Sequence, residues 1–189
     1  PPPPPKKGTA PKRARPATAE DAAAITRIEN HAILNSVAHF GLTPIEAEDT
    51  LRAFHFAQGK FPWLVAEIDG AVVGFARSGP WKTREAYRFT TEVGVYIDPE
   101  WQGKGIGKAL YTQLFEELKK LGFRTILAGI TLPNPASVGL HESFGMKHLG
   151  TIPRAGFKFE EWHDTGYWVT HLLENPASLA QTQCESGGD

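Results

Sequence analysis

The stretch VGVYIDPEWQGKGIGKALYTQLFEELKKLG, residues 93–122, decides the fold. An apolar run is followed by a glycine-rich turn, and then by a segment with apolar side chains at helical spacing. That stripe consists of Ile106, Leu110, Leu114 and Leu118. Gly122 follows the stripe, as glycine does at many helix C-termini. We therefore predict a strand over 90–97, a turn, and a helix over 105–121.

The turn has the composition of an anion-binding site. Gly103, Gly105 and Gly107 carry no Cβ, so an anion can approach the backbone closely. The following helix N-terminus exposes unpaired N–H groups and the positive end of its dipole. Lys104 and Lys108 add positive charge. A pyrophosphate fits such a turn, and a plain glycine-rich connection is the simpler alternative.

Two familiar phosphate motifs do not match. A Walker A loop ends in Gly-Lys-Ser/Thr, whereas Lys108 is followed by Ala109, which has no hydroxyl for magnesium. A dinucleotide fingerprint follows the first strand of a βαβ unit. This turn follows the third predicted strand, so neither class is favoured.

The flanking sequence completes a mixed domain. Thr18 resembles the N-cap of a helix with apolar positions on one stripe, and Asp69-Gly70 predicts a hairpin turn. The predicted elements are a helix from Thr18, a helix from about Thr43-Pro44 with apolar Ala47, Leu51, Phe54 and Phe56, strands 63–68 and 71–76, a strand 124–130, a helix 135–145 and two strands within 147–173. We expect an α/β fold of the α+β type, with a mixed central sheet of six to seven strands flanked by about four helices.

Bulk properties predict one folded domain. The chain has 189 residues, 41% of them hydrophobic, and a net charge of −1, which gives no bulk attraction to nucleic acid or membrane. We expect a disordered Pro/basic tail over 1–13, the domain over 14–173 and a flexible tail over 174–189. A lone Cys184 cannot form an internal disulfide, which favours a reducing, cytoplasmic location. Nuclear access through the basic tail stays open.

Several motifs together resemble a known family. Gln102-x-x-Gly105-x-Gly107 after Asp98-Pro99 resembles the acetyl-CoA motif of the GNAT superfamily. A narrower resemblance rests on PWLVAE (62–67), GPWK (79–82), Thr91-Glu92, Val95-Tyr96, LPN (132–134), LHE (140–142), GFK (156–158) and WHD (162–164). Over 14–173 these segments resemble phosphinothricin N-acetyltransferases and relatives that acetylate methionine sulfoximine or sulfone.

The resemblance implies direct acetyl transfer from acetyl-CoA to the α-amino group of a small amino acid or analogue, in a detoxifying homodimer that needs no metal. It implies that the N–H groups of Val95 and Ile97 face the thioester and pantetheine. The implied cofactor-binding residues are Val95, Tyr96, Ile97, Gln102, Gly103, Lys104, Gly105, Ile106, Gly107, Lys108, Asn134 and Ser137.

Two side chains match the family's proposed catalytic positions. An α-ammonium must lose a proton before it attacks a thioester, so the site needs a general base. Glu92 matches that base, and an exposed strand glutamate paired to a lysine is the alternative. His141 matches a second position that relays a proton, and a satisfied structural histidine is the alternative. The Val95 N–H is the expected oxyanion donor.

The acceptor is expected beside a cationic, aromatic loop. Lys82 and Arg84 are suited to pair with a carboxylate or phosphinate, and Tyr87 to donate a hydrogen bond. Phe40 matches a family residue that lines the same pocket. Exposed loop charges and a core aromatic are the alternatives.

The sequence also departs from the family. Gly41-Leu42 stands where an arginine is common, Asn134-Pro135-Ala136 lacks the usual acidic residue, and Gly139 replaces bulkier side chains. These departures bear on substrate identity more than on acetyl transfer. A GNAT enzyme for another amine (a peptide N-terminus or polyamine) and a non-catalytic acyl-CoA sensor are the competing hypotheses. The basic loop disfavours the first, and the presence of Glu92 and His141 disfavours the second.

Overall fold

The computed structural model describes residues 14–172, so the predicted tails over 1–13 and 174–189 lie outside the described residues. The strands are β1 (Ala14–Pro16), β2 (Trp63–Ile68), β3 (Ala71–Pro80), β4 (Thr90–Ile97), β5 (Thr125–Leu132), β6 (Lys147–Lys158) and β7 (Glu161–His171). The helices are α1 (Ala22–Asn35), α2 (Ala47–Ala57), α3 (Ile106–Lys120) and α4 (Pro135–Ser143), with short 3-10 turns at Ala19–Asp21, Glu85–Tyr87 and Pro99–Trp101.

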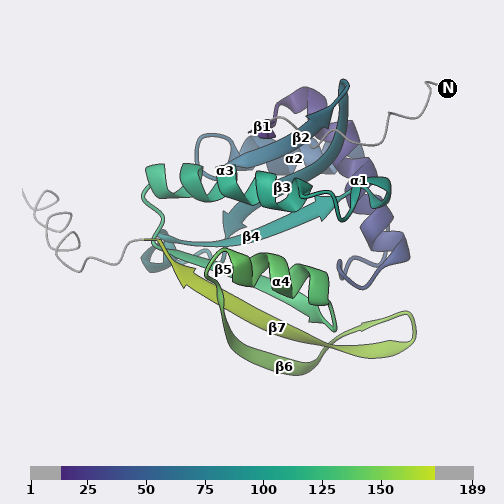
Figure 1. Ribbon diagram of the computed structural model, residues 1–189, viewed down its shortest axis with the longest axis vertical. Coiled ribbons are helices and arrows are strands. Elements are labelled where there is room, and N and C mark those ends of the chain that lie inside the picture. Colours follow the sequence, from purple (N-terminus) through teal and green to yellow (C-terminus); the bar gives the residue numbers. More distant parts are fainter. Residues whose placement is uncertain (1–13, 173–189) are drawn as a thin grey trace, which may run out of the picture.

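The strands form one sheet in the order β1-β2-β3-β4-β5-β7-β6 (Figure 1). Among the strands within 14–172, only β4 and β5 pair in parallel, and α3 connects them. All other neighbours are antiparallel. The mixed seven-stranded sheet with four α-helices confirms the predicted fold class.

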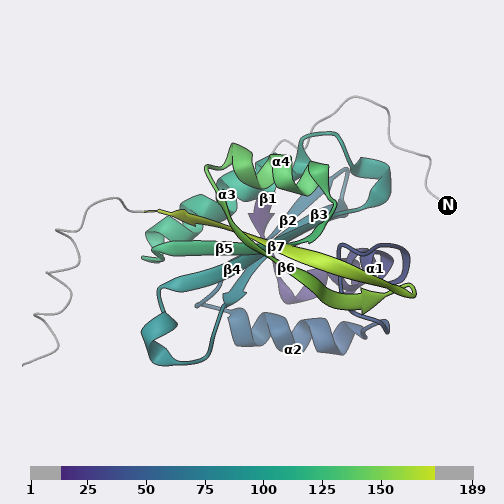
Figure 2. The same cartoon turned by 90° about the horizontal axis from the view of Figure 1, so that it is seen from below.

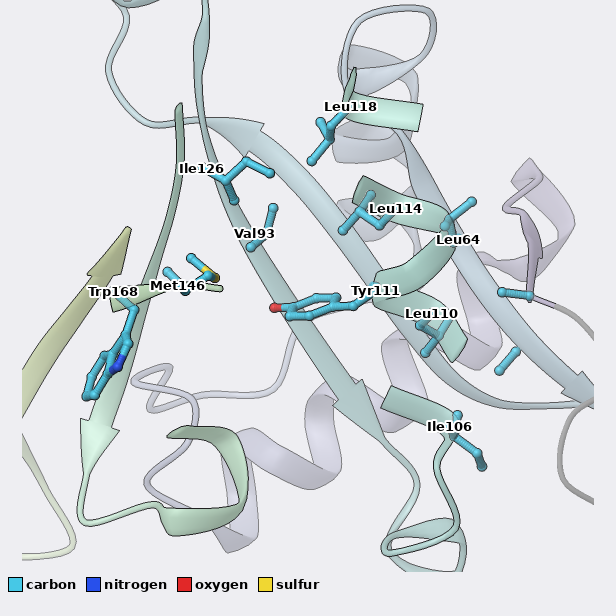
Figure 3. Close-up of a cluster of buried hydrophobic side chains, with 14 of the residues drawn as sticks. Leu64, Val93, Ile106, Leu110, Tyr111, Leu114, Leu118, Ile126, Met146 and Trp168 are labelled. Carbon is cyan, nitrogen blue, oxygen red and sulfur yellow. The ribbon is translucent and has the colours of Figure 1, made fainter. Parts of the chain in front are cut away.

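Helices cover both faces of the sheet: α3 and α4 lie on one face, and α1 and α2 on the other (Figure 2). The predicted stripe of α3 is buried against the first face, where Figure 3 shows it beside Leu64, Val93 and Ile126. Each of its four side chains is at most 1% exposed. Full burial of such a side chain stabilises a fold by about 1.5–3 kcal/mol, so this stripe anchors the β4–α3–β5 unit.

A second apolar cluster lies on the opposite face. Ile25 and Ile28 of α1 and Phe54 and Ala57 of α2 pack against Trp63, Val65, Val72 and Phe75 of the sheet. Helix α2 begins at Ala47 rather than near Pro44, because the Glu46 N–H donates to the Asp49 carboxylate and fixes the first turn there. Phe56, expected on the apolar stripe, is 59% exposed.

Two strands differ from the sequence-based prediction because pairing with a neighbouring strand determines their extent. The unpredicted β1 has only three residues and exists through its ladder with β2. Strand β3 runs to Pro80, four residues beyond the prediction, because Arg77 to Pro80 pair with Thr91 to Gly94 of β4. Among the described residues, every helix is too short or too polar to cross a membrane.

Candidate active site

The centre of the sheet opens where β4 parts from β5. Pairing covers only Thr90–Glu92 and Thr125–Leu127, although both strands continue. The Asp98 N–H donates to the Val73 carbonyl across the β3 edge at 2.9 Å. Because successive residues of a strand direct their N–H groups to opposite edges, those of Val95 and Ile97 point toward the opening. An extended ligand inserted there would meet these two donors.

The glycine-rich turn lies beside this opening. Gly103 and Gly105 adopt φ of +72° and +76°, which disfavours any residue with a Cβ, and Gly105 is the N-cap of α3. No heavy atom lies within 4 Å of a Cβ built on either glycine, so the backbone there is uncovered. At Gly107 a Cβ would lie 3.1 Å from Leu140 Cδ2, which shows how closely α3 approaches α4.

Several of the other predicted cofactor residues form hydrogen bonds within the protein. The Asn134 side chain accepts from the Ser137 N–H at 3.1 Å and caps α4. Gln102 Nε2 donates to the Ile97 carbonyl at 3.4 Å, and Lys104 Nζ donates to the Glu100 carbonyl at 2.9 Å. Tyr96 differs, because its ring stacks on Phe75 at 5.5 Å, on the α1/α2 face.

Glu92 lines a pocket of about 440 Å³ on that face. The pocket is bounded by α2, by β2, β3 and β4, and by Gly129 of β5. A Cβ on Gly129 would lie 3.5 Å from Glu92 Oε1, so the glycine leaves room around the carboxylate. Glu92 is an exposed position of β4, and the pocket walls still remove part of the water around its carboxylate, which raises the pKa of Glu92 above its ordinary value. A carboxylate with a raised pKa is a better base near neutral pH.

His141 lies in a different environment. It is buried on α4, and its Nδ1 donates to the Ser137 carbonyl at 2.7 Å, because a carbonyl can only accept. Its Nε2 therefore accepts from the Tyr111 hydroxyl, 2.9 Å away. Burial lowers the pKa of His141, which favours this neutral form. The structure brings His141 together with Tyr111 and Ser137. Glu92 lies in a different place, on the wall of the pocket described above.

Replacing Tyr111 with Phe is expected to lower the free energy of unfolding by about 1–3 kcal/mol, because His141 Nε2 then stays buried without a donor. Urea unfolding measures the change. Tyr167→Phe is the matched control, since no hydrogen bond of its hydroxyl is found within 14–172, and a change within about 0.5 kcal/mol is expected. Equal effects of the two substitutions would contradict a structural role for the Tyr111–His141 hydrogen bond.

The predicted acceptor residues are not on the walls of the Glu92 pocket. Lys82, Arg84 and Tyr87 line a separate hollow of about 380 Å³ on the loop between β3 and β4. Lys82 Nζ lies 4.8 Å from the centre of the Trp81 ring. Phe40 packs on the β6–β7 hairpin, where its ring atoms come within 2.4 Å of a Cβ built on Gly156.

Three charged or polar residues near the pocket were not predicted from the sequence. Arg77 of β3 lines the Glu92 pocket. Its Nη1 donates to Glu29 Oε2 at 2.9 Å and its Nη2 to Glu29 Oε1 at 2.5 Å. His39 Nε2 lies 3.0 Å from the same Glu29 Oε1. The only sequence signal was an arginine directly after the predicted strand 71–76.

Comparisons with known proteins agree with this geometry. Residues 29–146 match the model of the acetyltransferase (GNAT) family. The chain is 43% identical over 158 residues to a phosphinothricin N-acetyltransferase of Streptomyces viridochromogenes, covering 84% of this chain and 86% of the relative. It is 36% identical over 158 residues to an L-methionine sulfoximine/L-methionine sulfone acetyltransferase of Salmonella typhimurium, covering 83% and 92%.

Solved structures show the same fold with the donor bound. A GNAT superfamily phosphinothricin acetyltransferase from Sinorhizobium meliloti, in complex with acetyl-CoA, superposes with a TM-score of 0.83 at 37% identity. That match covers 87% of this chain and 90% of the other. The family match over more than half of the chain and these relatives define the chain as an acyltransferase. The chain belongs to the GNAT acetyltransferase family and is an N-acetyltransferase.

Proposed function

We propose that this enzyme transfers the acetyl group of acetyl-CoA to the α-amino group of a small amino acid or analogue of the phosphinothricin and methionine sulfone type. The observation that supports this most directly is the position of Glu92, a carboxylate of raised pKa in a pocket beside the β4–β5 opening. The names of the relatives support the substrate class.

In this proposal Glu92 is the general base. It accepts a proton from the α-ammonium, directly or through one water, and the free amine attacks the thioester carbonyl. The C–N bond forms, the attacking nitrogen loses its second proton, the C–S bond breaks, and the coenzyme A thiolate leaves and takes up that proton. The Val95 N–H, directed into the opening, donates to the oxyanion of the tetrahedral intermediate.

The donor is proposed to lie along β4, the turn and the start of α4. The N–H of Ile97 would face the pantetheine arm, and Asn134 and Ser137 would border it. Backbone N–H groups at the N-terminus of α3 would bind the pyrophosphate, supported by the uncovered backbone at Gly103 and Gly105. His141 is proposed to act indirectly, by fixing α4 against Tyr111.

The loop after β3 is proposed to contact the far end of the acceptor. Lys82, Arg84 and Tyr87 share a hollow that adjoins the strand ends next to Glu92, since Gly79 pairs with Glu92. Their charges suit a phosphinate or a sulfone oxygen. Phe40, which packs against Gly156 and does not line the Glu92 pocket, is proposed to border the acceptor from the loop after α1.

A thiol-release assay tests the proposal. The protein is incubated with acetyl-CoA and phosphinothricin, methionine sulfone, methionine sulfoximine, a polyamine and a short peptide. Turnover is expected with the amino acids and their analogues. Turnover with the polyamine or peptide alone would support the competing acceptor class. Acetyl-CoA binding without any turnover would support a sensor.

We also propose that the enzyme works in the cytoplasm as a homodimer. Several large apolar side chains of the β6–β7 hairpin are more than half exposed: Leu149, Ile152, Phe157 and Trp162. The rings of Phe157 and Trp162 have centres 5.2 Å apart, and exposed apolar patches are typical of protein interfaces. Light scattering coupled to gel filtration is expected to give twice the chain mass of 20.7 kDa, and a monomer mass at micromolar concentration would refute the dimer.

A further inference from the structure

The floor of the Glu92 pocket is a block of four residues in register. Arg77 pairs with Gly94, and Gly79 pairs with Glu92, across neighbouring antiparallel strands. Directly opposed residues share a face of the sheet, as do residues two apart. The two charged side chains therefore rise from diagonal corners of one face, about 7–8 Å apart between such positions, and the two glycines leave the space between them open.

Of the described residues that line this pocket, only Arg77 and Glu92 are charged. No ion pair joins Arg77 to Glu92. Arg77 pairs instead with Glu29, so the Glu92 carboxylate faces the pocket without an ion-pair partner from its walls. A zwitterionic amino acid carries an ammonium group and a carboxylate. Glu92 is suited to the ammonium group, and the guanidinium of Arg77 is suited to the carboxylate.

The side chain of Arg77 is fixed in position by an ion pair with Glu29 and by two aromatic rings. Burial alone would raise the pKa of Glu29, but the hydrogen bond with His39 and the charge of Arg77 lower it below its ordinary value, so Glu29 stays ionised. The guanidinium also lies over the rings of Trp63 and Phe75, at 5.3 and 5.6 Å from their centres. These contacts fix the plane of the guanidinium without enclosing it, since 28% of the side chain is exposed.

Three donors of this guanidinium remain for a ligand. An arginine carries five N–H donors, and the bonds to Glu29 use one on Nη1 and one on Nη2. The remaining donors suit a carboxylate, which binds a guanidinium in bidentate geometry. Lys82 and Arg84, the cations expected to bind this group, line a different hollow.

We propose that Arg77, positioned by Glu29 and His39, binds the α-carboxylate of the acceptor and so selects free amino acids over amines whose carboxylate is absent or blocked. The proposal rests on the proposed function, because it needs an amino acid in the Glu92 pocket. Glu29 and His39 are positioning residues in it, and Arg77 touches the substrate.

The experiment compares methionine sulfone with methionine sulfone amide, which keeps the α-amine and lacks the charge. The wild-type enzyme is expected to favour the acid in kcat/KM. Arg77→Gln is expected to lower kcat/KM for the acid by about 10–100-fold, mostly through KM, because charge-assisted hydrogen bonds are lost. The amide should be little affected, so the acid-to-amide ratio collapses. Arg52→Gln, an exposed arginine of α2, is the matched control and should keep the wild-type ratio.

Some outcomes would refute the role of Arg77 and leave the proposed acetyltransferase function intact. A wild-type enzyme that uses acid and amide equally well refutes the role of Arg77 while acetylation of an α-amine stands. A parallel loss for both acceptors in Arg77→Gln also refutes it. Arg77→Lys, with circular dichroism and acetyl-CoA binding as checks on folding, should keep part of the ratio. No turnover of any amino acid by the wild type refutes the proposed function itself.

Discussion

Replacing Glu92 with Gln is expected to lower kcat by about 10²–10³-fold, since a positioned general base contributes roughly 10²–10⁴-fold. The amide keeps the size of the side chain but cannot accept a proton from the acceptor ammonium. Acetyl-CoA binding should be unchanged, because the donor groups lie on β4 beyond Glu92 and on the turn. Thiol release under saturating acetyl-CoA measures the effect.

The pH dependence gives a second test of the same residue. Partial loss of water in the pocket raises the pKa of Glu92, so the rising limb of kcat/KM should lie above the ordinary glutamate value of 4.5 and disappear in Glu92→Gln. A raised folded-state pKa also means that ionisation opposes folding as pH rises through it. The variant should therefore be no less stable than the wild type at neutral pH. Glu116→Gln on an exposed position of α3 is the control. Unchanged kcat and an unchanged acid limb would remove Glu92 as the base.

Replacing Lys158 with Met is expected to lower the free energy of unfolding by about 3 kcal/mol or more, since buried acceptors left without a donor cost about 1–3 kcal/mol each. Lys158 is 3% exposed, and its ammonium donates to the carbonyls of Ile33, Ser36 and His39 at 2.5, 2.8 and 2.6 Å. Burial lowers the pKa of this amine, and the carbonyls oppose that effect because they accept from the charged form. The ammonium also lies at the C-terminal end of α1, where a cation is favourable.

Urea unfolding measures this loss, and Lys147→Met is the matched control. Lys147 is an exposed lysine at the other end of β6, so its replacement should change the unfolding free energy by about 0.5 kcal/mol or less. Lys158→Arg should rescue little, because a planar guanidinium does not direct three donors at three converging carbonyls. A Lys158→Met loss no larger than that of the control would show that this contact contributes little to stability.

The sequence-based prediction was most accurate for elements whose bounds follow from a local pattern of apolar and turn residues. The β2–β3 hairpin has a turn of two residues between apolar strands, and the stripe of α3 has four apolar positions at helical spacing. Strand β4 was predicted with its observed bounds for the same reason. Strand β1 lacks any pattern of its own and forms only through its partner, and the extension of β3 depends on a ladder with residues that follow a loop.

The candidate site divides in the same way. Glu92 and the glycine-rich turn could be predicted as site residues because each stands in a contiguous motif. The Arg77–Glu29–His39 cluster was missed because Arg77 and Glu29 are 48 positions apart in the chain and are joined only by packing of α1 on β3. The positive charges of Lys82 and Arg84 are evident from the sequence. Local sequence does not specify which hollow of the folded chain these side chains line.

The contact of Lys158 with the end of α1 can form only late in the synthesis of the chain. Its three acceptors precede it by 119–125 residues, so the segment after α1 lacks its anchoring cation until most of the chain has left the ribosome. That segment carries His39, which holds Glu29 behind Arg77. In synthesis from the N-terminus, the segment proposed to support the acceptor site therefore gains this contact only after the residues of β4, α3 and β5 have been made.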